Sequence, residues 1–169
     1  MCSNGGALQL MIQIVQGDIL QVEADAAVLS AHPTLIAGGG LSHVFHEAAG
    51  PQLELAAKEL GPIKPGEAVS TPGFQMRHKH VIHAVAPRFK FGVESEVELL
   101  KKTYRATISE AMRLGVRSIV VPSIGTGIYR WPLGVAVKVA LEELSKCSLE
   151  QVIICAFEDE VLEAYRKLS

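Results

Sequence analysis

Short apolar segments alternate with longer amphipathic segments along most of this 169-residue chain. The short segments have the length and the β-branched content that are typical of strands. Six strands are predicted, at Met11–Val15, Ala26–Ser30, Glu67–Ser70, His80–Ala86, Ser118–Pro122 and Gln151–Phe157. Because several of them are apolar at nearly every position, we expect a sheet that is covered on both faces.

The longer segments have apolar residues at helical spacing. Helices are predicted at Leu41–Leu60, Glu94–Leu114, Leu133–Leu144 and Glu158–Leu168, with a break at Gly50-Pro51 in the first. In the second helix the residues at this spacing are Val97, Leu100, Tyr104, Ile108 and Met112, and they are expected to face the core. Strands that alternate with helices predict one α/β domain, covering residues 11–169.

Composition and charge narrow the class of protein. The net charge of −2 gives no basic excess for binding nucleic acid, and the apolar runs are too short to cross a bilayer. The first residues lack the basic start and long apolar run of a secretory signal, so residues 1–10 are expected to form a flexible extension. Three cysteines without a CxxC pair favour a reducing, cytoplasmic location.

Two glycine-rich loops each follow a predicted strand and lead toward a predicted helix. The first contains Ala37-Gly38-Gly39-Gly40, and the second is SIGTGIYRW at residues 123–131. Ligands of α/β sheets bind at the carboxyl ends of the strands, where glycines let backbone N–H groups approach an anion. We therefore expect the loops to grip a diphosphate. Tyr129 and Trp131 are expected to be exposed at the turn, with Tyr129 stacked on a sugar or base and Trp131 packed beneath it.

A simpler interpretation is that both loops are turns that bind nothing, as most glycine-rich loops are. Neither loop has the spacing of a Walker loop or of the dinucleotide-binding fingerprint. Asp18, which follows the first strand, also has two interpretations. Its carboxylate is suited to accept a hydrogen bond from the amine of adenine, and it is equally suited to cap a turn.

Several ordered blocks of the sequence resemble a macrodomain. They are VQGDI at 15–19, DAAV at 25–28, GGGL at 38–41, HEAAGP at 46–51, GEAVSTPGF at 66–74, HVIHAVAP at 80–87 and VPSIGTGIYRWP at 121–132. This resemblance implies an α/β fold, a three-layer αβα sandwich with a central mixed, mostly parallel sheet, and a cleft that binds ADP-ribose.

The resemblance also implies roles for individual residues. Asp18 would bind the adenine amine, Ile19 would line the same pocket, and Tyr129 would lie beside the distal ribose. The first diphosphate loop would include Gly39, Gly40 and Leu41. The second would include Ser123, Ile124, Gly125, Thr126, Gly127, Ile128 and Tyr129, with the backbone N–H groups of residues 125–128 on the diphosphate.

Three positions depart from the family's pattern. Leu29 and His32 stand where macrodomains commonly have two asparagines, and Ser42 stands where one group of hydrolytic members has an aspartate. A serine does not act as a carboxylate base, so the usual hydrolytic residues are missing and the chain's catalytic residues stay unassigned. The His32 imidazole is able to contact the ribose or act as a base, but its ring would also narrow the pocket.

Two groups of histidines have part of the spacing of a metal site. They are His43 with His46, and His78 with His80 and His83. A zinc site needs three or four convergent ligands. On a strand, His83 points to the face opposite His78 and His80, and neither group has an obvious further ligand. We therefore expect neither a metal nor a cofactor.

Three functions follow as hypotheses. The first is binding of ADP-ribose, free or attached to a modified protein. The second is an enzyme that hydrolyses ADP-ribosyl groups or O-acetyl-ADP-ribose, with the phosphate of the substrate helping to activate water. The third is a divergent member that binds another nucleotide or nothing. We expect neither a membrane nor a nucleic acid as a partner.

Overall fold

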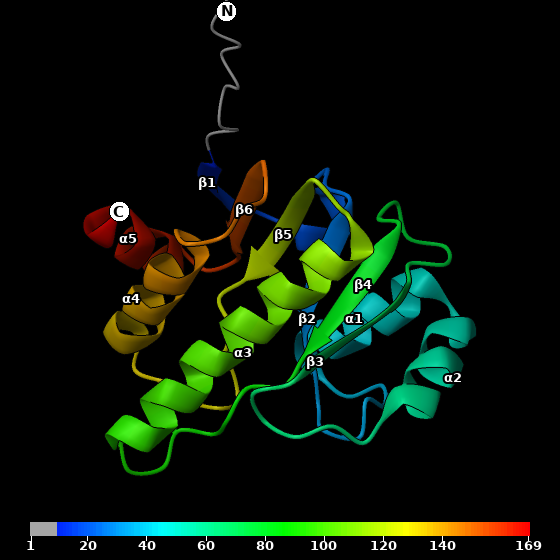
Figure 1. Ribbon diagram of the computed structural model, residues 1–169, viewed down its shortest axis with the longest axis horizontal. Coiled ribbons are helices and arrows are strands. Elements are labelled where there is room, and N and C mark those ends of the chain that lie inside the picture. Colours follow the sequence, from blue (N-terminus) through cyan, green and yellow to red (C-terminus); the bar gives the residue numbers. More distant parts are fainter. Residues whose placement is uncertain (1–9) are drawn as a thin grey trace, which may run out of the picture.

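The computed structural model of the protein describes residues 10–169, which form a six-stranded sheet between two layers of helices (Figure 1). The strands are β1 (Met11–Gln16), β2 (Ala26–Ser30), β3 (Ala68–Pro72), β4 (His80–Ala84), β5 (Ser118–Pro122) and β6 (Gln151–Ala156). Their order in the sheet is β1-β6-β5-β2-β4-β3, and only β3 is antiparallel to its neighbour. The predicted mixed, mostly parallel sheet is therefore confirmed.

The helices divide between the two faces of the sheet. They are α1 (Gly40–Ala49), α2 (Pro51–Leu60), α3 (Glu94–Leu114), α4 (Leu133–Leu144) and α5 (Asp159–Leu168). One core cluster joins the sheet to α3, α4 and α5, and a second joins it to α1 and α2. Figure 1 shows α3 and α4 in front of the sheet, and α1 on its far side. This is the three-layer sandwich that the sequence predicts.

Consecutive residues of β2 supply both core clusters. Ala26 and Val28 pack toward α3–α5, whereas Ala27 and Leu29 pack toward α1 and α2. All four side chains are fully buried. A central strand with helices on both faces must be apolar at every position. Leu29 therefore belongs to the core, and its side chain does not reach the surface at the end of the strand.

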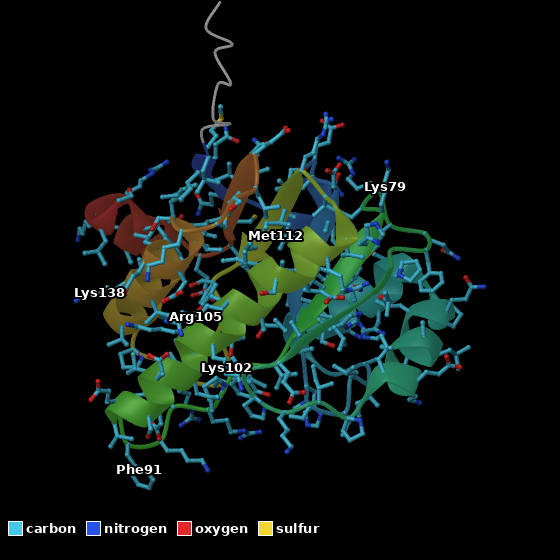
Figure 2. All side chains as sticks on the ribbon, in the orientation of Figure 1. Lys79, Phe91, Lys102, Arg105, Met112 and Lys138 are labelled. Carbon is cyan, nitrogen blue, oxygen red and sulfur yellow. The ribbon has the colours of Figure 1, made fainter. Side chains whose placement is uncertain are left out.

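One expected core residue of α3 lies outside the core. Met112 is 52% exposed, and Figure 2 shows it on the outward side of the helix. Steps of four residues drift by about 40° around a helix, so the series that begins at Leu100 has rotated off the buried face by residue 112. Ala111 is buried there instead. The prediction for Met112 was wrong, although the helix itself runs from Glu94 to Leu114 as predicted.

Most element boundaries fall within two residues of the predicted ones. The first predicted helix is divided at Gly50, whose φ of +88° separates α1 from α2. Cys155 is buried in β6, as the apolar run around it predicts. Residues 1–9 of the expected extension lie outside the described residues. Within residues 10–169, no helix has both the length and the apolar content needed to cross a membrane.

Candidate functional site

Both glycine-rich loops leave the same edge of the sheet. β2 and β5 are adjacent and parallel, with Ala26 beside Ile119 and Ala27 beside Val120. Their carboxyl ends therefore point the same way, toward the lower edge of the sheet in Figure 1. The first loop, defined here as residues 37–40, leads from β2 into α1, and the second, residues 123–131, leads from β5 to α4. The fold thus places the two loops at one edge of the sheet, as predicted, and on neighbouring strands.

The first loop presents an uncapped helix N-terminus. Gly39 is the N-cap of α1 and supplies no side-chain hydrogen bond. A Cβ atom added at Gly39 or Gly40 would meet nothing within 4 Å. Within residues 10–169, the N–H groups of Gly40 and Leu41 have no hydrogen-bond acceptor. Unpaired N–H groups in the first turn, together with the helix dipole, favour an anion at this position.

Two side chains hold the backbone just before that helix. The Ala37 N–H donates to Oε1 of Glu54 at 3.1 Å, and this hydrogen bond lowers the pKa of the Glu54 carboxyl. The Gly38 N–H donates to Oγ of Ser42 at 3.3 Å. Ser42 is buried, and its hydroxyl therefore fixes the shape of the loop rather than facing open solvent.

The second loop carries more unpaired N–H groups. Within the described part of the chain, no acceptor is found for the N–H groups of Gly125, Gly127, Ile128 and Tyr129. The Thr126 hydroxyl donates to the Ser123 carbonyl at 2.9 Å, which narrows the turn. A Cβ atom on Gly127 would meet nothing within 4 Å, and Ile128 is 84% exposed. The loop therefore has donors and open space for an anionic ligand.

Tyr129 and Trp131 are buried, which corrects the expectation that both are exposed. Their exposed fractions are 8% and 3%. The Trp131 indole donates to the Pro87 carbonyl at 2.8 Å, and its ring meets Phe89 edge-on with ring centres 5.4 Å apart. The Phe89 N–H donates to the Tyr129 carbonyl at 3.0 Å. The aromatic residues thus fasten the second loop to the segment that follows β4.

Arg88 lies over the ring of Tyr129, with its guanidinium carbon 5.3 Å from the ring centre. This distance is within the range of a cation–π contact. The guanidinium covers one face of the ring, and because Tyr129 is only 8% exposed, little of its side chain is open to a ligand. Stacking of a base on the full face of Tyr129, which is one sequence-based interpretation, does not agree with this geometry.

Asp18 caps a turn at the carboxyl end of β1. Its Oδ1 accepts a hydrogen bond from the Leu20 N–H at 3.0 Å, at the start of a single 3₁₀ turn, η1 (Ile19–Gln21). Oδ2 has no partner among the described residues, so the carboxylate retains an acceptor for a ligand. Asp18 lines a shallow groove of about 600 Å³ that also includes Val15 and Ile153. Ile19 is buried beside it.

Phe157 is a candidate site residue that the sequence interpretation missed. It follows β6 directly and is 80% exposed. β6 pairs with β1, and the Gly17 N–H donates to the Ala156 carbonyl at 3.1 Å, so Phe157 and Asp18 leave the same edge side by side. The sequence assigned Phe157 to the strand because it ends the apolar run QVIICAF. An exposed aromatic ring beside a free carboxylate suits a flat base with an amine.

His32 is exposed at the start of the segment after β2. Its Nδ1 accepts a hydrogen bond from the Thr34 N–H at 3.1 Å and lies 2.7 Å from the Thr34 hydroxyl. The ring is therefore held by a local turn, with Nε2 facing outward from these contacts.

The other histidines have different surroundings. His43 pairs with Glu47 at the surface, whereas His46, His78 and His83 are buried. Nε2 of His83 lies 3.0 Å from the Thr71 hydroxyl, and Nε2 of His78 lies 2.7 Å from the Val22 carbonyl. Within residues 10–169, no group of three or more histidine, cysteine or acidic side chains is placed to hold a metal.

The family model for the Macro domain matches residues 28–140. This chain belongs to the macro domain family. The matched region includes both glycine-rich loops, whereas Asp18 and Phe157 lie outside it. The resemblance noted in the sequence is therefore confirmed.

Known macrodomains are similar to this one over most of its length. An O-acetyl-ADP-ribose deacetylase of Salmonella gallinarum is 37% identical over 166 residues, which cover 93% of each protein. The Oceanobacillus iheyensis macrodomain with ADP has a TM-score of 0.89 and 29% identity, covering 96% of this chain and 91% of that one. The Trypanosoma brucei macrodomain in complex with ADP-ribose has a TM-score of 0.86 and 29% identity, covering 93% and 68%.

Proposed function

We propose that this macrodomain binds ADP-ribose through its two glycine-rich loops. The observation that carries the proposal is the set of unpaired N–H groups at Gly40 and Leu41 and at residues 125 and 127–129, on neighbouring strands at one sheet edge. Two groups of donors, one of them at a helix N-terminus, suit two linked phosphates. The similar macrodomains with ADP and with ADP-ribose support the same ligand class.

The order of the strands gives the ligand a direction. Along the edge, Asp18 follows β1, Phe157 follows β6, the second loop follows β5 and His32 follows β2. Three strand spacings of about 4.8 Å separate β1 from β2. In our proposal, adenine lies at Asp18, Ile19 and Phe157, the diphosphate lies at the loops, and the distal ribose lies near His32 and the edge of Tyr129.

Not every residue of the second loop has the same role in this proposal. The N–H groups of Gly125, Gly127 and Ile128 bind the diphosphate, and those of Ser123 and Ile124 do not. The Ile124 N–H is already donated to the Tyr104 hydroxyl at 3.2 Å. Thr126 does not donate to the ligand, because its N–H and hydroxyl both donate to the Ser123 carbonyl. It instead holds the shape of the turn. Gly39 contributes by leaving the start of α1 open.

Calorimetric titration with ADP-ribose tests the proposal. We expect one site of micromolar affinity, about −8 kcal/mol, and a large loss of affinity in Gly127→Glu. The new side chain at residue 127 points into open space, so the fold is retained while the diphosphate meets a carboxylate. Absence of ADP-ribose binding, or tighter binding of ADP, ATP or NAD, would contradict the proposal and favour a different nucleotide.

Hydrolysis of an ADP-ribose ester is a second candidate function. The observation in its favour is the 37% identity to a relative named O-acetyl-ADP-ribose deacetylase. Water would add to the ester carbonyl carbon, the bond to the sugar oxygen would break, and acetate and ADP-ribose would leave. Ser42 is committed to the Gly38 N–H, so a phosphate oxygen of the substrate is the base that we propose. Acetate release by the wild type that does not exceed release by Gly127→Glu would exclude this function.

The natural partner and the location belong to the same proposal. An ADP-ribosylated protein fits a site whose distal end lies at the open edge of the sheet. We infer a cytoplasmic location from the three cysteines of the sequence, which include no CxxC pair. Binding of a purified ADP-ribosylated protein, compared with the same protein unmodified, tests the partner. Fractionation of the native cells tests the location.

A further inference from the structure

Two buried tyrosines hold the root of the second loop. Tyr104 of α3 accepts the Ile124 N–H at 3.2 Å. Tyr165 of α5 donates its hydroxyl proton to Oγ of Ser123 at 3.1 Å. Both tyrosines have an exposed fraction of 0%. Two helices that are separate along the chain therefore each contact one of two consecutive residues just after β5 ends.

The Ile124 N–H lies beyond the end of β5, and its acceptor is the Tyr104 hydroxyl in place of a neighbouring strand. β5 ends at Pro122, and Ile124 is fully buried in the core on the α3–α5 side. A buried N–H group without an acceptor destabilises the folded state. The Tyr104 hydroxyl therefore supplies the acceptor that the buried Ile124 N–H requires in this backbone conformation. Burial, reinforced by Tyr165, raises the pKa of Tyr104 well above its usual value, so the phenol stays neutral.

These contacts determine where the next residues point. Ile124 and Gly125 are both buried, Gly125 has a φ of +89°, and the unpaired N–H groups follow at residues 125 and 127–129. An N–H group that binds an anion must be held in the right direction before the ligand arrives, since ordering a loop during binding reduces affinity. The hydroxyls of Tyr104 and Tyr165 thus act directly upstream of the donors.

We propose that Tyr104 and Tyr165 are positioning residues for diphosphate binding, which they serve by fixing Ser123 and Ile124 without touching the ligand. The inference rests on the proposed function of the second loop. A residue with a general role in stability would affect both ends of the ligand, whereas the two hydroxyls are proposed to affect binding of one end only. Removing either hydroxyl weakens binding of the diphosphate and distal ribose and leaves binding of the adenosine end nearly unchanged.

The test compares two ligands in conservative variants. Tyr104→Phe and Tyr165→Phe retain the buried rings and remove one oxygen each. Calorimetry with ADP-ribose and with adenosine, which carries no phosphate, gives a ratio of affinities for each protein. We expect the ratio to fall about five- to twentyfold in both variants, which corresponds to about 1–2 kcal/mol. In a double-mutant cycle, Ser123→Ala combined with Tyr165→Phe should cost no more than either single change.

Thr107 provides a matched control on α3. Its buried hydroxyl lies one turn beyond Tyr104 and donates to the Thr103 carbonyl at 2.8 Å. The hydroxyls of Thr103 and Thr107 form their hydrogen bonds with Val85, Leu99 and Thr103, and not with residues of the second loop. Thr107→Val removes a buried hydroxyl of the same helix, so we expect a change in stability with an unchanged affinity ratio. Equal losses for ADP-ribose and adenosine in the tyrosine variants, or no loss at all, would overturn the inference.

Hydrogen exchange separates this inference from the proposed function. If wild-type protein does not bind ADP-ribose, the proposed function fails, and the exchange rates of the N–H groups from Ile124 to Tyr129 still test the tyrosines. Faster exchange in Tyr104→Phe and Tyr165→Phe than in Thr107→Val supports their positioning role. Rates equal to those of the control variant would show that the loop is held by other contacts.

Discussion

Gly125 lies so close to Trp131 that a Cβ atom on Gly125 would be 2.7 Å from Cδ1 of the indole ring. Gly125 also has a φ of +89°, a conformation that side chains disfavour. The Trp131 N–H donates back to the Gly125 carbonyl at 3.0 Å. The glycine therefore lets the loop close over the tryptophan, and Gly125 and Gly127 have different reasons to lack a side chain.

Gly125→Ala should destabilise the protein, whereas Gly127→Ala should not. The first change combines a positive φ with a contact to Trp131, and we expect a loss of about 3 kcal/mol in the free energy of unfolding. The second places a methyl group in open space and should cost less than about 1 kcal/mol. Urea unfolding of both variants checks the difference. Equal stability of the two variants would contradict this prediction, since it would mean that Trp131 shifts without cost to accommodate the new methyl group.

Gly39→Asp should separate stability from binding. Gly39 is the N-cap of α1 with φ −84° and ψ 179°, and a side chain there meets nothing within 4 Å. An aspartate fits this position and caps the helix, and its charge interacts favourably with the helix dipole. These effects should stabilise the fold by a few tenths to about 1 kcal/mol. Its carboxylate would occupy the place of the phosphate, so ADP-ribose affinity should fall at least tenfold.

Thermal unfolding and calorimetric titration measure the two effects of Gly39→Asp. Gly39→Ala is the control, because it adds a side chain without a charge or a cap. An aspartate variant that binds ADP-ribose as well as the alanine variant would show that no phosphate lies at the start of α1.

Asp18→Asn should change the preferred base and leave the local turn intact. Asparagine caps a helix as well as aspartate does, so the hydrogen bond from Leu20 is retained. The amide nitrogen would face the adenine amine, and ADP-ribose affinity should fall about tenfold, about 1.4 kcal/mol. The hypoxanthine analogue carries an acceptor at that position and should bind the variant better than ADP-ribose does. Parallel titration with both ligands checks this change of preference. An unchanged preference would show that adenine does not bind at Asp18.

Stability should fall in mild acid because of buried histidines. Burial lowers the pKa of His83 to about 4, and burial also lowers the pKa values of His46 and His78. Between pH 6.5 and 4 the unfolded chain binds a proton at His83 and the folded protein does not. The free energy of unfolding is therefore unaffected above pH 6.5 and decreases below it, by about 3 kcal/mol for His83 at pH 4.

Urea unfolding at pH 7.0, 6.0 and 5.0 tests this dependence before most carboxylates titrate. The double variant Thr71→Val with His83→Leu replaces both partners of a buried hydrogen bond, which leaves no unpaired hydroxyl. Its stability should depend less on pH than that of the wild type. The same pH dependence in both proteins would assign the effect to His46 and His78 alone.

Much of the fold follows from local sequence patterns. Strands such as Ser118–Pro122 are recognisable because burial on both faces requires apolar residues at every position. The loops at Gly39 and at Gly125 were predicted from their positions between a strand and a helix. Leu29 shows that a departure from a family motif does not by itself identify a change in the ligand site. It departs from the family's pattern, but its side chain is buried in the core and cannot contact a ligand at the surface.

The exposure of aromatic residues was decided only by the tertiary structure. Tyr129 and Trp131 were expected at the surface because they follow a glycine-rich turn, yet the segment Pro87–Phe89 comes from elsewhere in the chain and covers them. Phe157 looked like the end of a strand, yet β6 stops one residue earlier and leaves the ring exposed. Burial depends on which distant segments pack against a residue.

The sequence by itself determined the alternation of strands and helices, the two glycine-rich loops and the family to which the chain belongs. The tertiary structure decided which loop N–H groups remain unpaired, and which side chains hold the loops in place. Tyr104 and Tyr165 lie 61 residues apart in the sequence and reach Ser123 and Ile124 only after α3 and α5 have packed on the same face of the sheet. Periodicity predicts that such residues are buried, but it carries no information about the partners of their hydroxyl groups.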